Sequence, residues 1–149
     1  MNENFLTSPQ EAAYFVEKTG VSALAVSVGN IHMATDEESP IDLDLLEEIN
    51  RLASVPLVMH GGTGFPDRLV PEVMKRGVYK FNVGSIMKKV FLRELKSGLI
   101  GEDLEEIDFA LIHHLVDWPG SRNIFEQAYS AVKEIVKEKI RVYGSAGKG

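Results

Sequence analysis

The sequence predicts an α/β protein whose strands run parallel and are joined by helices. Three short apolar runs, at residues 21–28, 57–60 and 78–83, alternate with longer segments of helical periodicity. Parallel strands need such helical crossovers, because a two-residue turn joins only antiparallel neighbours. Ligands of parallel sheets bind at the carboxyl ends of the strands, so we expect a functional site where these runs end.

Capping residues and apolar periodicity indicate where the helices lie. Ser8 and Pro9 begin the first helix, Glu11 can complete a capping box, and Gly20 ends it. Similar patterns predict further helices over residues 42–53, 67–76, 85–96 and 121–143. Residues 98–119 show no clear pattern and are not assigned.

Length and composition favour one ordinary globular domain without affinity for polyanions. The 149 residues are 44% hydrophobic and 26% charged, and 16 basic against 22 acidic residues give a net charge of −6. This balance predicts no nucleic-acid or membrane partner. The absence of cysteine restricts metal ligands to histidine, carboxylate or carbonyl groups. Without an apolar run near the roughly 20 residues of a membrane span, or a signal peptide, a cytoplasmic protein is expected.

The run that ends at His60 carries the strongest functional signal. An imidazole can ligate a metal, and the glycine-rich stretch Gly61–Gly64 before the next helix lets main-chain N–H groups close on an anion. The other two runs lead to His32 and to the segment Asn82–Ser85. The sequence therefore predicts that three strand ends deliver functional residues to one face.

Each of these residues also has an ordinary structural interpretation. A single histidine is more often a polar loop residue than a ligand, Gly61–Gly64 alone could be a turn with a helix cap, and Asn82 could be a turn residue. Their shared position at strand ends favours a metal and phosphate site. His113 and His114 are adjacent and point in different directions on a helix, so we do not expect them to bind a metal.

Three motifs together resemble the C-terminal half of the class II, metal-dependent ketose-bisphosphate aldolases. They are Gly29-Asn30-Ile31-His32, His60-Gly61-Gly62-Thr63-Gly64 and Lys80-Phe81-Asn82-Val83-Gly84-Ser85. The resemblance implies part of a (β/α)₈ barrel, about strands six to eight with their helices and a C-terminal helix. It would form a single partial domain over residues 1–149, with a flexible tail over residues 144–149.

The resemblance also implies an activity, that of an aldehyde-lyase of carbohydrate metabolism such as glycolysis. The reaction would be zinc-dependent, reversible cleavage of a fructose- or tagatose-type ketose 1,6-bisphosphate to dihydroxyacetone phosphate and an aldehyde. His32 and His60 would be two of three histidine ligands of Zn²⁺. The phosphate and adjoining substrate atoms would be bound by Gly61, Gly62, Thr63, Asn82, Val83, Gly84 and Ser85.

Two departures from the family pattern bear on what the chain does alone. The Asp-His segment that supplies the third ligand and the general acid/base is absent, so no catalytic residue is assigned here. Met33 replaces a glycine whose main chain helps to hold phosphate or a monovalent cation, and that contact is not carried over.

Three strands cannot close an eight-stranded barrel, so open edges and apolar faces should remain exposed. We expect a homo-oligomer or a complementing N-terminal half, and no catalysis by the isolated chain. The chain would be a fragment, a truncated gene product or half of a two-piece barrel. The alternative function is a truncated, non-catalytic phosphate-binding or assembly module.

Overall fold

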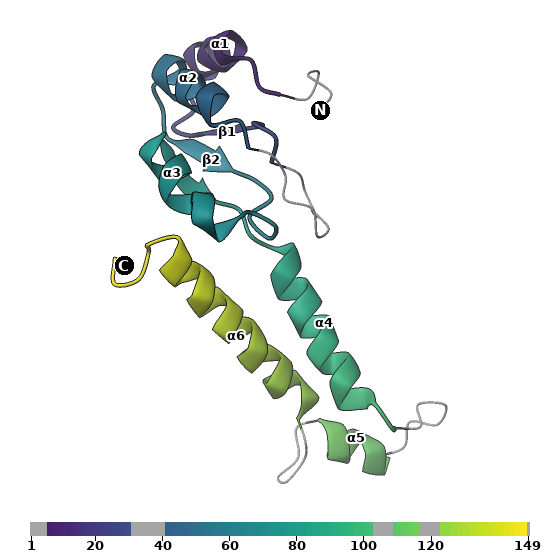
Figure 1. Ribbon diagram of the computed structural model, residues 1–149. Coiled ribbons are helices and arrows are strands. Elements are labelled where there is room, and N and C mark those ends of the chain that lie inside the picture. Colours follow the sequence, from purple (N-terminus) through teal and green to yellow (C-terminus); the bar gives the residue numbers. More distant parts are fainter. Residues whose placement is uncertain (1–5, 31–40, 103–108, 117–122, 149) are drawn as a thin grey trace. The chain divides into compact units, whose positions relative to one another are not determined.

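The computed structural model describes residues 6–30, 41–102, 109–116 and 123–148 (Figure 1). The chain forms two compact units, Met1–Gly84 and Ser85–Gly149. The first unit contains a parallel sheet with helices between its strands, and the described part of the second is helical. The expected α/β class is therefore confirmed. His32 and Met33 lie outside the described residues.

The sheet has the order β1 (Leu24–Val26), β2 (Leu57–Met59) and β3 (Val78–Phe81), and both pairs are parallel. All of β2 is buried, as expected for a central parallel strand. Within the described residues β1 and β3 each pair on one side only, so the prediction of open edges is confirmed. The strands are shorter than the apolar runs, because a strand requires a pairing partner. In the first run residues 22, 23 and 25 are exposed, so its apolar character does not reflect burial throughout.

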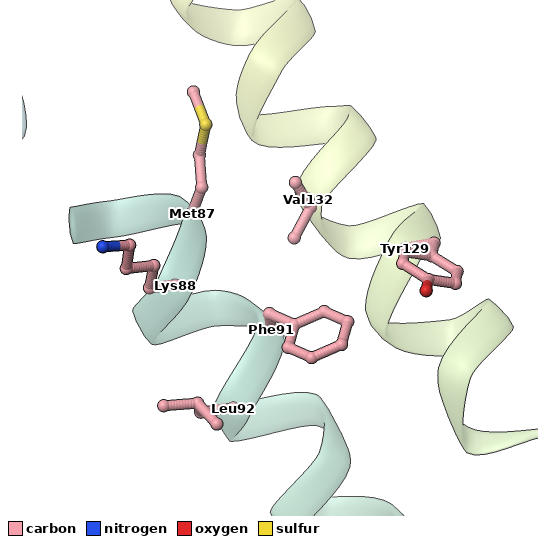
Figure 2. Close-up of a pocket in the computed structure, with 6 residues that line it drawn as sticks. All are labelled: Met87, Lys88, Phe91, Leu92, Tyr129 and Val132. Carbon is pink, nitrogen blue, oxygen red and sulfur yellow. The ribbon is translucent and has the colours of Figure 1, made fainter. Parts of the chain in front are cut away.

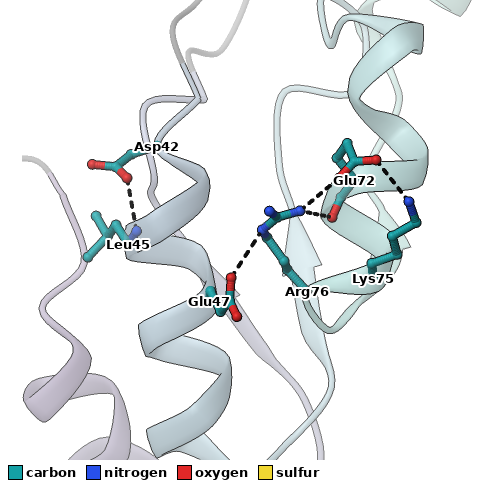
Figure 3. A network of polar contacts seen from close by, with 6 residues as sticks. All are labelled: Asp42, Leu45, Glu47, Glu72, Lys75 and Arg76. Atoms are coloured by element: carbon teal, nitrogen blue, oxygen red, sulfur yellow. Dashed lines mark hydrogen bonds and ion pairs between the residues drawn. The ribbon is translucent and has the colours of Figure 1, made fainter.

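Two helices lie side by side on the first unit, α1 (Pro9–Thr19) and α2 (Leu43–Ala53) (Figure 1). Ser8 Oγ accepts the N–H of Glu11 at 3.4 Å, and Gly20 caps the other end of α1, as predicted. Asp42 Oδ1 accepts the N–H of Leu45 at 2.9 Å and caps α2 (Figure 3). These contacts satisfy main-chain groups that the helices leave unpaired at their ends.

The helix predicted over residues 67–76 is divided in the structure. A 3-10 helix η2 (Asp67–Leu69) leads into α3 (Val70–Lys75), with Pro71 in the first turn of α3. The proline ring would clash with the carbonyl of the residue four positions earlier, Asp67, if one α-helix continued through both. A 3-10 turn therefore precedes the α-helix.

The core of the first unit lies between the sheet and its helices. Burying each of its large side chains contributes about 1.5–3 kcal/mol relative to exposure. The largest fully buried side chains are Val28, Leu46, Ile49, Leu57, Met59, Val70, Val73 and Val78. Several large apolar side chains elsewhere are exposed, including Tyr79 at 78%, so the predicted exposure of apolar surface is also confirmed.

The second unit contains α4 (Ser85–Leu99), α5 (Phe109–Leu115) and α6 (Ile124–Val142), of which α4 and α6 pack against each other. At Gly98, a Cβ atom would lie 2.5 Å from Ile124 Cγ2, so the two helices meet where one has no side chain. Helix α5 lies in the segment that the sequence left unassigned. No described helix has the length and apolarity of a membrane span.

Two predictions about chain organisation stay predictions. One is the single partial domain over residues 1–149. The other is the flexible tail over residues 144–149. After α6 the main chain turns back on the helix, since Gly144 N–H donates to Arg141 O at 3.0 Å and Ser145 N–H to Ile140 O at 2.9 Å.

Candidate functional site

His60 directly follows the central strand and is held at two points by asparagines from the neighbouring strands. Its main-chain oxygen accepts Nδ2–H of Asn30 at 3.1 Å, and its ring Nε2 lies 3.1 Å from Nδ2 of Asn82. Asn30 lies beyond the end of β1, and Asn82 directly follows β3. The prediction that the ends of the strands converge is confirmed for His60 and Asn82.

Main-chain bonds fix the position of Asn82 relative to His60. Asn82 N–H donates to Met59 O at 2.8 Å and extends the β2–β3 ladder, while its carbonyl accepts Gly62 N–H at 3.1 Å. Met59 and Gly62 are therefore both hydrogen-bonded to Asn82, and His60 and Gly61 lie between them. This places the ring of His60 next to the Asn82 amide. Gly61 has φ +73°, a conformation that favours glycine, and its carbonyl accepts Gly64 N–H at 3.1 Å.

A hollow of about 290 Å³ adjoins these strand ends. It is lined by Thr7, Ala25, Val26, Ser27, Asn30 and His60. Thr7 is held just beyond the end of β1, because Thr7 N–H donates to Ser27 O and Thr7 Oγ1 accepts Ser27 N–H, both at 2.8 Å. An imidazole, an amide and two hydroxyl-bearing residues thus surround a space near the lower end of the size range of small-ligand pockets.

Comparison with known proteins assigns the family. The model of the fructose-bisphosphate aldolase class-II family matches residues 1–148. The chain belongs to this family.

Solved aldolase structures support the assignment. The YdjI aldolase from Escherichia coli K12 is 28% identical, with a TM-score of 0.71 over 95% of this chain. A candidate fructose-1,6-bisphosphate aldolase from Coccidioides immitis is 25% identical, with a TM-score of 0.69 over 96% of this chain. The fructose-bisphosphate aldolase of Campylobacter jejuni is 16% identical, with a TM-score of 0.69 over 96% of this chain, and supports the fold alone.

The match covers this chain almost completely but only part of each relative. The three solved chains are covered to 46%, 45% and 47%, so the chain spans about half of their length. Its fold is that of a partial (β/α)₈ barrel, in which the three parallel strands are a sector of the barrel wall. The class II aldolase fold inferred from the sequence motifs is therefore confirmed.

The chemistry of His60 suits the zinc ion that this aldolase family generally requires. Neutral imidazole nitrogen is a common zinc ligand, and hydrogen-bonded partners usually orient such a ring. Asn82 Nδ2, a donor, lies 3.1 Å from the ring Nε2 and orients the ring through that nitrogen. The described segments contain no group of three histidine, cysteine or acidic side chains that could hold a metal. Of the two predicted ligands, the described residues include only His60, so a complete ligand set requires groups outside them.

The residues predicted to bind phosphate lie in the segments that follow β2 and β3. Gly61, Gly62 and Thr63 follow β2, whereas Asn82, Val83 and Gly84 follow β3 and precede Ser85, the first residue of α4. The N–H of Gly62 is directed to Asn82 O and holds the loop rather than pointing outward. The role of all seven residues in phosphate binding stays a prediction.

Asn30 is the residue of this site to which the sequence assigned no role. It belongs to the motif that contains His32, and the function of that motif was assigned to His32 alone. Its side chain both donates to His60 O at 3.1 Å and accepts Val28 N–H at 2.9 Å. The sequence did contain a signal for this role: Asn30 follows one predicted parallel strand, and His60 ends the next.

The second unit contains an apolar hollow of about 410 Å³ between α4 and α6 (Figure 2). Its lining residues are Met87, Lys88, Phe91, Leu92, Tyr129 and Val132. The rings of Phe91 and Tyr129 lie 5.7 Å apart at 41°. None of the lining residues is a histidine or a carboxylate, so this hollow is not a candidate metal site.

Proposed function

We propose that the chain is part of a zinc-dependent aldolase that cleaves a ketose 1,6-bisphosphate, of the fructose or tagatose type, to dihydroxyacetone phosphate and an aldehyde. The observation that carries this proposal is the convergence of Asn30, His60 and Asn82 at the ends of three parallel strands in a class II aldolase chain. A place in carbohydrate metabolism such as glycolysis and a cytoplasmic location belong to the same proposal.

In this proposal His60 and His32 bind the metal through ring nitrogens. When bound, zinc supplies Lewis acidity toward the substrate oxygens that gain negative charge during carbon–carbon cleavage. His60 is suited to this task because its main chain is held by Asn30 before any ligand arrives. A ligand held in advance loses less conformational freedom on binding.

The segments after β2 and β3 bind the phosphate of the substrate in the same proposal. These residues are Gly61, Gly62, Thr63, Asn82, Val83, Gly84 and Ser85. In (β/α)₈ barrels the phosphate site is frequently formed by the loops after the last two strands. Phosphate binding away from the bond that breaks contributes positioning, which lowers the barrier to cleavage.

The acid/base group and the third metal ligand are assigned to a complementing N-terminal half of the barrel. Such a half would also pair with the open edges of β1 and β3. Association with it, or into a homo-oligomer, is therefore part of the proposal, and the chain alone should not catalyse.

The test combines the chain with a separately produced N-terminal half from a class II aldolase. We expect aldol cleavage of fructose or tagatose 1,6-bisphosphate by the mixture but not by either part. Replacing His32 and His60 by alanine should remove bound zinc and reduce cleavage by at least about 10³-fold, because a metal-dependent step loses its Lewis acid. The matched control is the double replacement of His113 and His114, also by alanine, which both lie in α5 and should leave both quantities unchanged.

Two outcomes would overturn the proposal. Full zinc content in the double variant lacking His32 and His60 would exclude them as ligands. Binding of dihydroxyacetone phosphate by a complemented mixture without any cleavage would instead support the alternative, a non-catalytic phosphate-binding or assembly module.

A further inference from the structure

The carboxamide of Asn30 joins two strand ends that the main chain does not join. Its Oδ1 accepts Val28 N–H at 2.9 Å, and its Nδ2–H donates to His60 O at 3.1 Å. Both partners are main-chain groups, one just after β1 and one just after β2. The Asn30 side chain thus acts as a peptide group would in a ladder between these strands.

A side chain is needed here because the paired part of β1 has ended. The last paired residues of the two strands are Val26 and Met59, one position before His60. Beyond Val26, Ser27 is bonded through its main chain to Thr7. The main-chain carbonyl of His60 faces the β1 side of β2, where the side chain of Asn30 donates a hydrogen bond to it.

The other side of His60 is held differently. Asn82 Nδ2 lies 3.1 Å from the ring Nε2, so β3 fixes the ring while Asn30 fixes the main chain. A ring can keep a contact of this length only if its own Cα stays in place. A shift of the His60 main chain toward or away from β1 would therefore lengthen the ring contact to Asn82.

We propose that Asn30 is a positioning residue for His60, which holds the His60 main chain so that the imidazole keeps one position and one orientation for metal binding. This inference deepens the proposed function and rests on it where metal is concerned. Asn30 does not touch the metal or the substrate in this role. It acts through the His60 carbonyl alone.

The choice of asparagine follows from the two bonds. A carboxamide offers one acceptor and a donor pair on the same planar group, which matches Val28 N–H and His60 O. Aspartate has the same shape and keeps the acceptor, but it cannot donate and would place a carboxylate oxygen against the His60 carbonyl. Asn30→Asp therefore removes one bond while preserving the other.

The first measurement observes the His60 ring in the metal-free chain. Long-range ¹H–¹⁵N spectra, recorded where imidazoles are neutral and assigned with His60→Ala, report which ring nitrogen carries the proton. With Asn82 Nδ2 donating to Nε2, we expect the proton on Nδ1 in the parent chain. In Asn30→Asp the populations should move toward those of free imidazole, which favours Nε2–H.

The matched control is Asn123→Asp, which introduces the same change of charge at the cap of α6. Asn123 accepts Glu126 N–H through Oδ1, a bond that aspartate retains. We expect this variant to give the parent spectrum of His60. Asn30→Ala serves as a second, uncharged variant, and loss of cooperative unfolding in both Asn30 variants would make the residue a determinant of folding and overturn its positioning role.

The second measurement is Zn²⁺ affinity of the complemented barrel, determined by calorimetry. Loss of an outer partner of a metal-binding histidine typically weakens metal binding 10–100-fold, and we expect roughly tenfold or more for Asn30→Asp. Unchanged tautomer populations and unchanged affinity in Asn30→Asp would overturn the positioning role. Absence of zinc binding by the parent barrel would instead contradict the proposed function, while the ring spectra would still test Asn30.

Discussion

The amide nitrogen of Asn82, which directly follows β3, lies 3.1 Å from Nε2 of His60, which directly follows β2, so Asn82 orients the His60 ring. Asn82 is itself held by main-chain bonds to Met59 and Gly62. An amide N–H that faces Nε2 requires the lone pair there and the proton on Nδ1. In the proposed site a metal at Nε2 would displace this amide, so the proposal predicts a movement of Asn82 on metal binding.

Asn82→Ala should release the His60 ring. Loss of one partly buried hydrogen bond is expected to lower the free energy of unfolding by about 1 kcal/mol. Ring ¹H–¹⁵N spectra should show a shift from the Nδ1–H tautomer toward Nε2–H. Asn123→Ala removes a helix cap of similar energetic value and should leave the ring spectrum unchanged. An unaltered tautomer in Asn82→Ala would show that Asn82 does not direct the ring.

The sequence predicts the elements of this fold better than their contacts. Ser8, Gly20 and Asp42 identify helix ends because capping depends on neighbours a few residues away. The bond between Asn30 and His60 depends on strand register and on where β1 stops pairing. Apolar periodicity specifies neither the strand register nor the last paired residue of a strand. The convergence of the strand ends could therefore be predicted, whereas the contacts of Asn30 and Asn82 with His60 could not.

Gly77 allows the turn into β3 to approach α2. Its φ is +87°, and a Cβ there would lie 1.9 Å from Oδ1 of Asn50. Gly101 has the same φ of +87° with no atom within 4 Å of its Cβ position. Gly101→Ala therefore measures the backbone strain alone, about 1 kcal/mol, and Gly77→Ala adds the clash. Denaturant unfolding should show the larger loss for Gly77→Ala, and equal losses would exclude the clash.

Leu57 anchors the centre of the sheet and is fully buried. Leu57→Ala should lower the free energy of unfolding by about 2–5 kcal/mol, because it removes buried methyl groups and leaves a cavity. Leu92 on α4 is 64% exposed and provides the control with the same change of side chain. Its replacement by alanine should cost less than about 0.5 kcal/mol. A small effect at Leu57 would mean that the sheet is not the core of the first unit.

Parts of the site depend on residues that strand patterns cannot place. Gly61–Gly64 was predicted as a glycine-rich turn, and the bond from Gly64 N–H to Gly61 O at 3.1 Å shows that it is one. The bond from Gly62 N–H to Asn82 O is a contact between segments about 20 positions apart in the sequence, and local turn preferences do not specify it. Long-range contacts of this kind follow only from the completed sheet.

Arg76 lies between carboxylates of two helices (Figure 3). Its Nη1 donates to Glu72 Oε2 and to Glu72 O, both at 3.0 Å. Its buried Nε lies 3.5 Å from Glu47 Oε2, an ion-pair distance without hydrogen-bond geometry. Lys75 Nζ binds the other oxygen of Glu72 at 3.0 Å. The carboxylate of Glu72 is thus bonded to two cations.

Hydrogen bonds from Lys75 and then Arg76 lower the pKa of Glu72 below its ordinary value of 4.5. Because the folded-state pKa is depressed, the ionised carboxylate stabilises the fold above the ordinary value, and this contribution disappears as the pH falls through the lowered pKa. Glu72→Gln should therefore lose less stability than the parent when the pH is lowered through this range. Chemical denaturation at a series of pH values measures the difference.

Lys75→Met removes the hydrogen bond that is the largest cause of the lowered pKa of Glu72. We expect the pKa of Glu72, followed by NMR of its side-chain carboxyl, to rise toward 4.5 when this donor is removed. Lys89→Met removes an exposed lysine of α4 in the other unit and should leave the Glu72 titration unchanged. An unchanged pKa in Lys75→Met would assign the depression to Arg76, whose Nη1 contact would then be the stronger of the two in solution.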